Sequence, residues 1–429
     1  MRLLYSIIWW LILPVALFRL YWRGRKEPGY RRHIPERLGF FPDTVPAKQR
    51  IWIHAVSVGE TRASEPLIRA LLSRFPECQI LLTHMTPAGR VTGHDLFETE
   101  KRFNRLIQVY LPYDTNTMMR RFIRHYGPCA CILLETEIWP NLIRQCVKNQ
   151  VPLALVNARL SERSLKKGQK IRSIMNEAAR GFSLVAAQTQ TDAQRLKQFG
   201  SENIVVTGSV KFDIDPPASA LAKGEKLRKL IGNRPVLMCA STRDGEEVQI
   251  LDALEKLDTQ ALMLLVPRHP QRFEEVAQLI ETRRIPMIRR SVLNDFSGKP
   301  ISPDTRILLG DSMGEMFMYY AACDIAFIGG SLEKLGGQNL IEACAVGKPV
   351  LIGPHTFNFE AITVDAIREK AAIRITTATE LMQQANDLLT DKTRCREMGH
   401  NAQQFAKKQH GATERTLALL APLIESTAS

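Results

Sequence analysis

From residue 51 onward, short apolar runs alternate with longer stretches in which apolar residues recur at helical spacing, as Leu67, Ala70 and Leu71 do. Continuous apolar strands separated by helices are typical of parallel sheets that are covered on both faces. The first series of expected strands covers 51–56, 80–84, 106–110, 130–135, 153–156, 184–187 and 204–207. The second series covers 236–240, 262–266, 306–309, 325–328 and 350–352. The pattern predicts an α/β fold with two doubly wound, Rossmann-like domains.

The expected boundary between the domains lies just before Pro216 and Pro217, so that one domain covers 23–213 and the other 214–405. Helical periodicity continues through 406–429, and it does not decide whether this last segment crosses back to the first domain. Ligands of open α/β sheets bind beyond the carboxyl ends of the strands. We therefore expect the site in a cleft that the two domains face.

Residues 1–22 are predicted to form a membrane-anchor helix, because 3–18 are almost wholly apolar and a basic cluster follows them. A secretory signal has its basic region before the apolar stretch and small residues after it, unlike this segment. The positive-inside rule keeps the basic side, and hence the body of the chain, in the cytoplasm. The apolar stretch is short for a span and contains Pro14. A single span, a helix lying in the interface and an apolar helix packed on the body therefore all stay open.

The net charge of +14 points to anionic partners. Residues 1–50 hold ten basic and three acidic residues, a surplus of seven, which is half of the total. This concentration favours anionic lipids over nucleic acid, whose binders spread their charge over a large face. A chain with 45% apolar and 24% charged residues is not disordered. None of the eight cysteines forms a Cys-x-x-Cys pair, so no zinc site is expected.

Charged residues follow several expected strands of the first domain. Glu60 stands at a helix entrance, where a carboxylate is either a general base or a charge that complements the helix dipole. Glu135 and Glu137 point the same way if the chain stays extended, so they bind acceptor hydroxyls or form a salt-bridged strand end. Lys211 neutralises a phosphate in the cleft, or it is simply solvated.

The second domain has the stronger local signals. Arg268 and His269 stand between two prolines, whose restricted backbone suits a preorganised anion contact. Gly310 and Asp311 follow a strand and are candidates to contact a nucleoside base or a phosphate. Segment 329–342 predicts a glycine-rich loop that leads into a helix. In such a loop, backbone N–H groups approach a phosphate and the helix N-terminus stabilises its charge.

Two readings are open for Glu342, which accepts hydrogen bonds from ribose hydroxyls or forms a capping-box-like pair with Asn339. The loop matches neither G-x-G-x-x-G nor G-x-x-x-x-G-K-[ST], which argues against a Rossmann dehydrogenase or a P-loop enzyme. His355 has no second histidine at a suitable spacing, so it is not expected to bind a metal.

Six strings, in order at the expected strand ends, carry a resemblance to a known family. They are Ala55-Val56-Ser57-Val58-Gly59-Glu60, Leu134-Glu135-Thr136-Glu137-Ile138-Trp139-Pro140-Asn141, Asn157-Ala158-Arg159-Leu160-Ser161, Pro267-Arg268-His269-Pro270, Gly329-Gly330-Ser331-Leu332 and Gly353-Pro354-His355-Thr356-Phe357-Asn358-Phe359. Together they resemble the 3-deoxy-D-manno-octulosonic acid (Kdo) transferases of lipopolysaccharide biosynthesis, over essentially the whole chain.

The resemblance implies a GT-B-like fold and an inverting transfer of Kdo from CMP-Kdo to a hydroxyl of the tetraacylated lipid A precursor. It implies a location at the cytoplasmic face of the inner membrane, with a single N-terminal anchor among anionic lipids. Two alternatives are a GT-B enzyme that uses a UDP-sugar, and a non-enzymatic membrane-associated binder of anionic partners.

In that family the glutamate of the Ser-Val-Gly-Glu turn is the proposed base, which is Glu60 here. The expected donor-binding residues are Lys211, Arg268, His269, Leu309, Gly310, Asp311, Leu335, Gly336, Gly337, Gln338, Asn339 and Glu342. Where the family often has Gly-Gly-His-Asn-Pro-Leu-Glu, this chain has Gln338, Leu340 and Ile341, so a backbone-amide role is expected at position 338. No cofactor and no metal ligand is expected, because Lys211, Arg268 and a helix N-terminus can stabilise the departing CMP.

Overall fold

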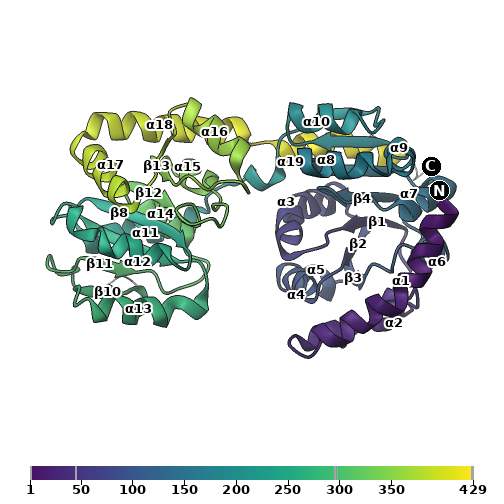
Figure 1. Ribbon diagram of the computed structural model, residues 1–429, viewed down its shortest axis with the longest axis horizontal. Coiled ribbons are helices and arrows are strands. Elements are labelled where there is room, and N and C mark those ends of the chain that lie inside the picture. Colours follow the sequence, from purple (N-terminus) through teal and green to yellow (C-terminus); the bar gives the residue numbers. More distant parts are fainter. Residues whose placement is uncertain (1, 44–45, 294–295, 297, 427–429) are drawn as a thin grey trace. The chain divides into compact units, whose positions relative to one another are not determined.

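The computed structural model describes residues 2–43, 46–293, 296 and 298–426, and the chain divides into two compact units (Figure 1). Unit 1 comprises Met1–Asp213 and Gly411–Ser429, and unit 2 comprises Ile214–His410. The division after Asp213 falls where the sequence places it. The second division falls after His410, because α18 (Lys392–Gln409) continues through the expected boundary at 405/406 and belongs wholly to unit 2.

Unit 1 contains a seven-stranded sheet whose strands pair in parallel, in the order β3-β2-β1-β4-β5-β6-β7. The strands are β1 (Gln49–His54), β2 (Cys78–His84), β3 (Leu106–Tyr110), β4 (Ala130–Leu134), β5 (Leu153–Ala158), β6 (Leu184–Ala187) and β7 (Ile204–Val206). Each corresponds to an expected strand. The chain adds β2 and β3 on one side of β1 and then returns to add β4 to β7 on the other side. The topological switch point of the sheet therefore lies between the neighbouring strands β1 and β4.

Unit 2 contains a second seven-stranded parallel sheet, in the order β10-β11-β9-β8-β12-β13-β14. Its strands are β8 (Val236–Thr242), β9 (Leu262–Pro267), β10 (Met287–Arg289), β11 (Ile307–Leu309), β12 (Ile325–Ile328), β13 (Val350–Ile352) and β14 (Ala372–Arg374). The sequence analysis missed β10 and β14. Both are three-residue edge strands that each end in an arginine, so they lack the continuous apolar run of a central strand.

Helices connect the strands in both units. In unit 1 they are α1 (Arg2–Arg23), α2 (Ile34–Arg37), α3 (Val58–Arg74), α4 (Pro87–Leu96), α5 (Glu98–Arg102), α6 (Asn116–Tyr126), α7 (Pro140–Lys148), α8 (Glu162–Gln169), α9 (Arg172–Arg180), α10 (Gln190–Lys197) and α19 (Ala412–Glu425), with 3₁₀ turns η1 (Pro28–Arg31) and η2 (Val210–Phe212). In unit 2 they are α11 (Ala218–Ile231), α12 (Glu246–Asp252), α13 (Phe273–Thr282), α14 (Met316–Ala322), α15 (Ile341–Ala345), α16 (Glu360–Arg368), α17 (Ala378–Thr390) and α18, with η3 (Leu254–Lys256), η4 (Pro270–Arg272) and η5 (Arg290–Val292).

The sheet of unit 1 is buried on both faces, as the apolar strands predict. Ile51 and Ile53 of β1 pack into one core cluster, while Trp52 between them packs into the cluster on the other face. The C-terminal helix α19, yellow in Figure 1, contributes Leu420 and Ile424 to the first of these clusters, beside α3. The last helix therefore completes the core of unit 1, which answers the question that its periodicity left open.

The N-terminal helix α1 packs one side on unit 1, where Leu13 and Leu20 are buried with Tyr113 and Met118. Among the described residues, α1 alone holds a stretch, Tyr5–Arg23, that is long and apolar enough to cross a membrane by length and composition. That stretch has a mean hydropathy of 1.4, and 11% of it is buried.

Candidate active site

The turn between β1 and α3 holds Glu60 at the carboxyl edge of the unit 1 sheet. Ser57 is extended and precedes the first helical residue, Val58, which puts Glu60 in the first turn of α3. The carboxylate turns back onto the loop, where Glu60 Oε2 accepts a 2.6 Å hydrogen bond from the Val56 amide. Oε1 has only a long contact of 3.4 Å with the Ser57 hydroxyl, so it is the less committed oxygen.

The surroundings of Glu60 disfavour its charge. Burial raises its pKa from the ordinary 4.5 to about 7, and the nearby Glu137 and Glu135 carboxylates add to the increase, while the Val56 hydrogen bond opposes it. A carboxylate with a pKa near neutrality has the basicity that a general base needs at physiological pH. Its place in the first turn of α3 also fits the alternative of a dipole-complementing charge, but burial and two neighbouring carboxylates are not needed for that role.

Glu135 and Glu137 follow β4, and both carboxylates lie close enough to Glu60 to raise its pKa. The backbone is left-handed at Glu135, so the chain does not stay extended, which was the condition for the two carboxylates to point the same way. Glu137 Oε2 accepts a 2.7 Å hydrogen bond from the Trp139 indole, and burial raises the pKa of Glu137. Glu135, with a φ of 61°, forms an ion pair with Lys211. Glu135 is salt-bridged, as one interpretation of the strand end expects, whereas Glu137 is hydrogen-bonded to a neutral indole. The binding of acceptor hydroxyls by these carboxylates stays a prediction. Lys211 contacts a carboxylate of unit 1 here.

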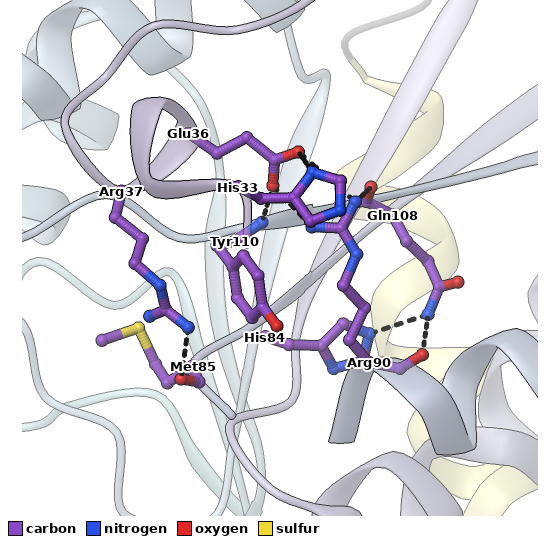
Figure 2. A network of polar contacts seen from close by, with 8 residues as sticks. All are labelled: His33, Glu36, Arg37, His84, Met85, Arg90, Gln108 and Tyr110. Atoms are coloured by element: carbon purple, nitrogen blue, oxygen red, sulfur yellow. Dashed lines mark hydrogen bonds and ion pairs between the residues drawn. The ribbon is translucent and has the colours of Figure 1, made fainter. Parts of the chain in front are cut away.

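A buried polar network ties the segment after α1 to the sheet beneath this turn (Figure 2). The Glu36 carboxylate accepts hydrogen bonds from Arg90 Nη1 at 2.6 Å and from the Tyr110 amide at 2.7 Å. The Arg37 guanidinium lies 3.7 Å from the centre of the Tyr110 ring and donates to the Met85 carbonyl at 3.1 Å. These contacts fix the end of β2, which adjoins the loop that carries Glu60.

His84 extends the network toward the Glu60 turn. Burial lowers its pKa to about 3, so the ring is neutral. Gln108 Nε2 lies 3.0 Å from His84 Nε2, and His84 Nδ1 lies 3.0 Å from the Ala55 carbonyl, which assigns the ring proton to Nδ1. A neutral imidazole therefore supports Ala55, the first residue after β1 on the way to Glu60.

In unit 2, Arg268 and His269 are exposed directly after β9, and the Arg268 amide donates to the Thr242 carbonyl at 2.9 Å. Burial and the charges of Arg243, Arg268 and Arg272 lower the pKa of His269. A neutral histidine within a group of arginines donates a hydrogen bond without adding to the positive charge. Arg272 is ion-paired with Asp244, Glu247 and Glu275, so Arg243 and Arg268 are the cations at the carboxyl ends of β8 and β9 that suit an anion; we call these two arginines the cationic cluster.

Glu342 lies within electrostatic reach of this cluster. Burial raises its pKa, and Arg268 opposes that increase. Glu342 stands in α15, which has only five residues, and the side chain of Asn339 accepts a 3.0 Å hydrogen bond from the Ile341 amide. This contact is a local turn between residues two apart, and the residue that caps α15 is Leu340, without a side-chain hydrogen bond. The capping-box-like pair of Asn339 with Glu342 is therefore not formed. The expected helix after the glycine-rich loop is present, but α15 has only five residues, so its N-terminus offers a phosphate little dipole stabilisation.

A buried carboxylate shapes the glycine-rich loop. Glu246 is completely buried and accepts hydrogen bonds from the amides of Gly330, Ser331 and Leu332, at 2.5, 2.9 and 2.9 Å. These amides are oriented toward Glu246, so they do not form the expected phosphate-binding edge. Gly336 has a φ of 91°, and a Cβ added there would lie 2.3 Å from Asn358 Nδ2.

Of the remaining residues that were predicted to bind the sugar donor, some are partly exposed and others are buried. Asp311 accepts hydrogen bonds from Arg289 Nε at 3.0 Å and from the Ser291 amide at 2.8 Å, which holds the chain beyond β10. Leu309 and Gly310 are buried, and a Cβ at position 310 would lie 2.8 Å from Val266 Cγ2. Leu335, Gln338 and Asn339 are partly exposed, whereas Gly337, like Gly336, is buried.

The expectation of metal-independent transfer also rested on the absence of an Asp-x-Asp pair, and that premise is wrong, because Asp213-Ile214-Asp215 is such a string. The Asp213 carboxylate accepts hydrogen bonds from the amides of Gly411 and Thr413, at 2.7 and 2.6 Å, and so caps α19. Asp215 lies in unit 2, 3.3 Å from the His410 ring. Within the described part of the chain, no group of three or more His, Cys, Asp or Glu side chains could hold a metal ion.

Comparison with known proteins places these features in a family. Residues 32–214 match the family described as 3-Deoxy-D-manno-octulosonic-acid transferase (kdotransferase), and residues 298–405 match Glycosyl transferases group 1. A 3-deoxy-D-manno-octulosonic acid transferase from Bordetella pertussis is 41% identical over 418 residues, which cover 95% of this chain and 96% of that protein. The chain belongs to the Kdo transferase family. The Haemophilus influenzae Kdo transferase is 35% identical and covers 99% of both chains.

This Kdo transferase also shares its fold with other glycosyltransferases. A solved glycosyltransferase from Rickettsia africae ESF-5 matches 88% of this chain and 98% of its own length with a TM-score of 0.58. Its sequence identity is 14%, so the likeness concerns the fold alone. The two expected Rossmann-like domains are confirmed, as is the expected glycosyltransferase activity in lipopolysaccharide biosynthesis.

Sequence reasoning missed two polar residues at the strand ends of this Kdo transferase. Glu246 is the first residue of α12, directly after the N-cap Gly245, and that strand-to-helix position was the signal that could have found it. Asn157 at the end of β5 is completely buried, with a φ of 53°, and its Oδ1 accepts a 3.1 Å hydrogen bond from Ser209. It joins β5 to the segment that carries Lys211.

Proposed function

We propose that this Kdo transferase moves Kdo from CMP-Kdo to a hydroxyl of the tetraacylated lipid A precursor, with inversion at the anomeric carbon. The observation that carries the proposal is the Glu60 carboxylate, which stands at the carboxyl edge of the sheet with a pKa raised to about 7. Family membership supports Kdo as the transferred group. The donor, the acceptor and the stereochemistry belong to the proposal.

In the proposed step, Glu60 Oε1 takes the proton of the acceptor hydroxyl as that oxygen attacks the anomeric carbon of Kdo. The bond from that carbon to the phosphate oxygen breaks, and its electron pair leaves with CMP. Oε2 stays hydrogen-bonded to the Val56 amide, which keeps the carboxylate oriented throughout. General-base assistance of this kind contributes about 10²–10⁴-fold to the rate. The hydroxyl attacks the face of the anomeric carbon opposite the departing CMP. A single displacement of this kind inverts the configuration at that carbon, as proposed.

The departing CMP develops negative charge, and unit 2 offers it the cationic cluster. Arg268 supplies a fixed positive charge and the neutral His269 a hydrogen-bond donor. Glu342, beside Arg268, is proposed to accept from the ribose hydroxyls. Lys211 remains a proposed second cation, released from Glu135 when a phosphate competes for it. The proposed transfer needs no metal ion.

The proposed location is the cytoplasmic face of the inner membrane, where the precursor presents its sugar head and acyl chains. The exposed apolar side of α1 and the basic residues that follow it support this location. Anionic lipids are the proposed partners of this segment. No nucleic acid is proposed to bind.

The direct test incubates the purified full chain with CMP-Kdo and tetraacylated precursor, with and without EDTA, and measures the product masses. We expect the precursor to gain the mass of one or more Kdo residues in both samples, and CMP to inhibit more strongly than UDP. An unchanged precursor mass, or stronger inhibition by UDP, would contradict the donor assignment. Activity that EDTA abolishes and a divalent metal restores would contradict the metal-independent step.

A further inference from the structure

Helix α1 has two dissimilar sides along its full length. One side packs on unit 1, and its described members recur at helical spacing. They are Tyr5, Trp9, Leu13, Ala16, Leu17 and Leu20. Of these, Leu13 and Leu20 are buried among Tyr113 and Met118. A helix that contacts the domain from its first described turn to its last lies along that domain.

Polar and aromatic contacts hold both ends of α1. Near its start, the Tyr5 hydroxyl donates a 2.8 Å hydrogen bond to Asp114, whose side chain is completely buried. One turn further, the rings of Trp9 and Tyr113 lie 5.9 Å apart. At the other end, the Arg23 guanidinium lies 4.3 Å from the centre of the Tyr30 ring. The helix is therefore fixed at each end.

The opposite side of α1 presents large apolar residues to solvent. Its exposed members are Ile7, Ile8, Trp10, Leu11, Ile12, Val15, Phe18, Tyr21 and Trp22. Leu11 is 71% exposed and Phe18 is 68% exposed, which is unusual for such side chains in water. A continuous apolar strip of this length requires an apolar partner.

Basic residues flank this strip at the C-terminal end of α1. The exposed ones are Arg19, Arg23, Arg25, Lys26, Arg31 and Arg32, while Glu27 is the acidic residue among them. An apolar strip with a cationic margin has the chemistry of an interfacial helix on an anionic membrane, where the margin meets the lipid phosphates.

We infer that α1 lies in the plane of an anionic bilayer surface, with its packed side on unit 1 and its apolar strip in the acyl boundary, and that it does not cross the membrane. A crossing helix would have to leave Tyr113, Met118 and Asp114, and so expose the surface that it covers. If it stayed docked, the Tyr5–Asp114 pair would enter the hydrocarbon, where an ionisable group is costly. Lying flat retains the packing and still removes the exposed strip from water.

A topology experiment separates the two arrangements in the full chain. An N-terminal epitope tag is exposed to protease either in intact spheroplasts or in inverted membrane vesicles. The flat arrangement predicts that the tag is cut only in inverted vesicles, because both ends of α1 stay on the cytoplasmic side. Cleavage of the tag in spheroplasts would mean that α1 crosses, and it would overturn the inference.

A binding experiment tests the lipid surface itself. The purified chain is sedimented with vesicles of phosphatidylcholine alone or mixed with phosphatidylglycerol. We expect binding to the mixed vesicles that weakens with salt, and at least tenfold weaker binding for the variant with Leu11→Glu and Phe18→Glu. Val91→Glu, at another exposed apolar position of unit 1, is the matched control and should bind normally. An unchanged Kd for the double variant would contradict the inference.

The same samples exclude a second copy of the chain as the occupant of the strip. Gel filtration without lipid should give the same size for the wild-type chain and the double variant. A dimer that the double variant abolishes, with vesicle binding unaffected, would assign the strip to self-association. Point variants are preferred to deletion of α1, which would uncover Leu38, Tyr113 and Met118. The inference is independent of the donor and of the role of Glu60, since neither experiment measures transfer.

Discussion

The Glu60 carboxylate accepts a 2.6 Å hydrogen bond from the amide of Val56, four residues earlier in the chain. This contact folds the acid back over the loop between β1 and α3, and the second oxygen keeps only a long contact with Ser57. Hydrogen bonding alone would lower the pKa, but burial outweighs it and raises the pKa to about 7. The balance of these effects determines when Glu60 can take a proton, and the predictions below test it.

The rate should depend on pH through Glu60. With a pKa of about 7, the carboxylate is increasingly protonated below neutrality, so kcat/KM should fall about tenfold per pH unit there and level off above pH 7. Glu137→Gln removes a neighbouring charge that raises this pKa, so it should move the fall to lower pH. A fall centred near the ordinary value of 4.5 in the unmodified chain would contradict the assignment.

Glu60 should lower stability at neutral pH. Its folded pKa is above its ordinary value, so between pH 4.5 and 7 the folded chain retains a proton that the unfolded chain has released. The free energy of unfolding of Glu60→Gln should therefore exceed that of the wild-type chain by roughly 1–3 kcal/mol at pH 8, after allowance for partial exposure. The difference should shrink toward pH 5. Urea unfolding measures it, with Glu65→Gln on the same helix as control, and a difference that does not vary with pH would contradict the prediction.

Glu246 should be essential to unit 2. Its buried carboxylate accepts from the amides of Gly330, Ser331 and Leu332, and Glu246→Gln would place an NH₂ group against these donors. Leaving a buried donor without its acceptor costs about 1–3 kcal/mol. We expect urea unfolding to show a loss of this order and calorimetry to show weaker CMP binding. Exposed Glu255→Gln should change neither, and a fully stable Glu246→Gln chain would refute the role.

Arg268 should carry part of the affinity for CMP. The Arg268 side chain is exposed directly after β9, so truncating it should leave the fold intact. A hydrogen bond to a charged group is worth about 1.5–3 kcal/mol, so Arg268→Ala should weaken CMP binding about 10–100-fold. Arg283→Ala, which removes an arginine paired with Asp252, is the matched control. Equal affinities of the two variants, measured by calorimetry, would remove Arg268 from the site.

The sequence predicts those parts of the molecule that depend on local pattern. Central strands such as β4 and β9 are continuous apolar runs, and the turn that carries Glu60 follows β1, whose apolar residues Ile51, Trp52 and Ile53 predict it. The edge strands β10 and β14 lack such runs because one side of each has no neighbouring strand. Periodicity therefore finds the central strands of both sheets and the apolar edge strands β3 and β7 of unit 1, and it misses the edge strands of unit 2 that contain an arginine.

Side-chain partners distant in sequence could not be predicted. The ion pair of Lys211 with Glu135 joins residues 76 positions apart, and Glu246 reaches an amide 86 positions away. Nothing near either residue in the sequence indicates the partner. The same limit applies to α1. Its apolar composition predicts a membrane helix, while its contacts with residues more than 90 positions away, such as Tyr5 with Asp114 and Leu13 with Tyr113, show that it is docked on unit 1.

The most direct test of the account compares Glu60→Gln with Glu65→Gln in the transfer of Kdo from CMP-Kdo to the tetraacylated precursor. We expect kcat of Glu60→Gln to fall about 10²–10⁴-fold while its Kd for CMP stays unchanged, and Glu65→Gln to behave like the wild-type chain. A near-normal kcat for Glu60→Gln, with CMP binding intact, would show that Glu60 is not the base.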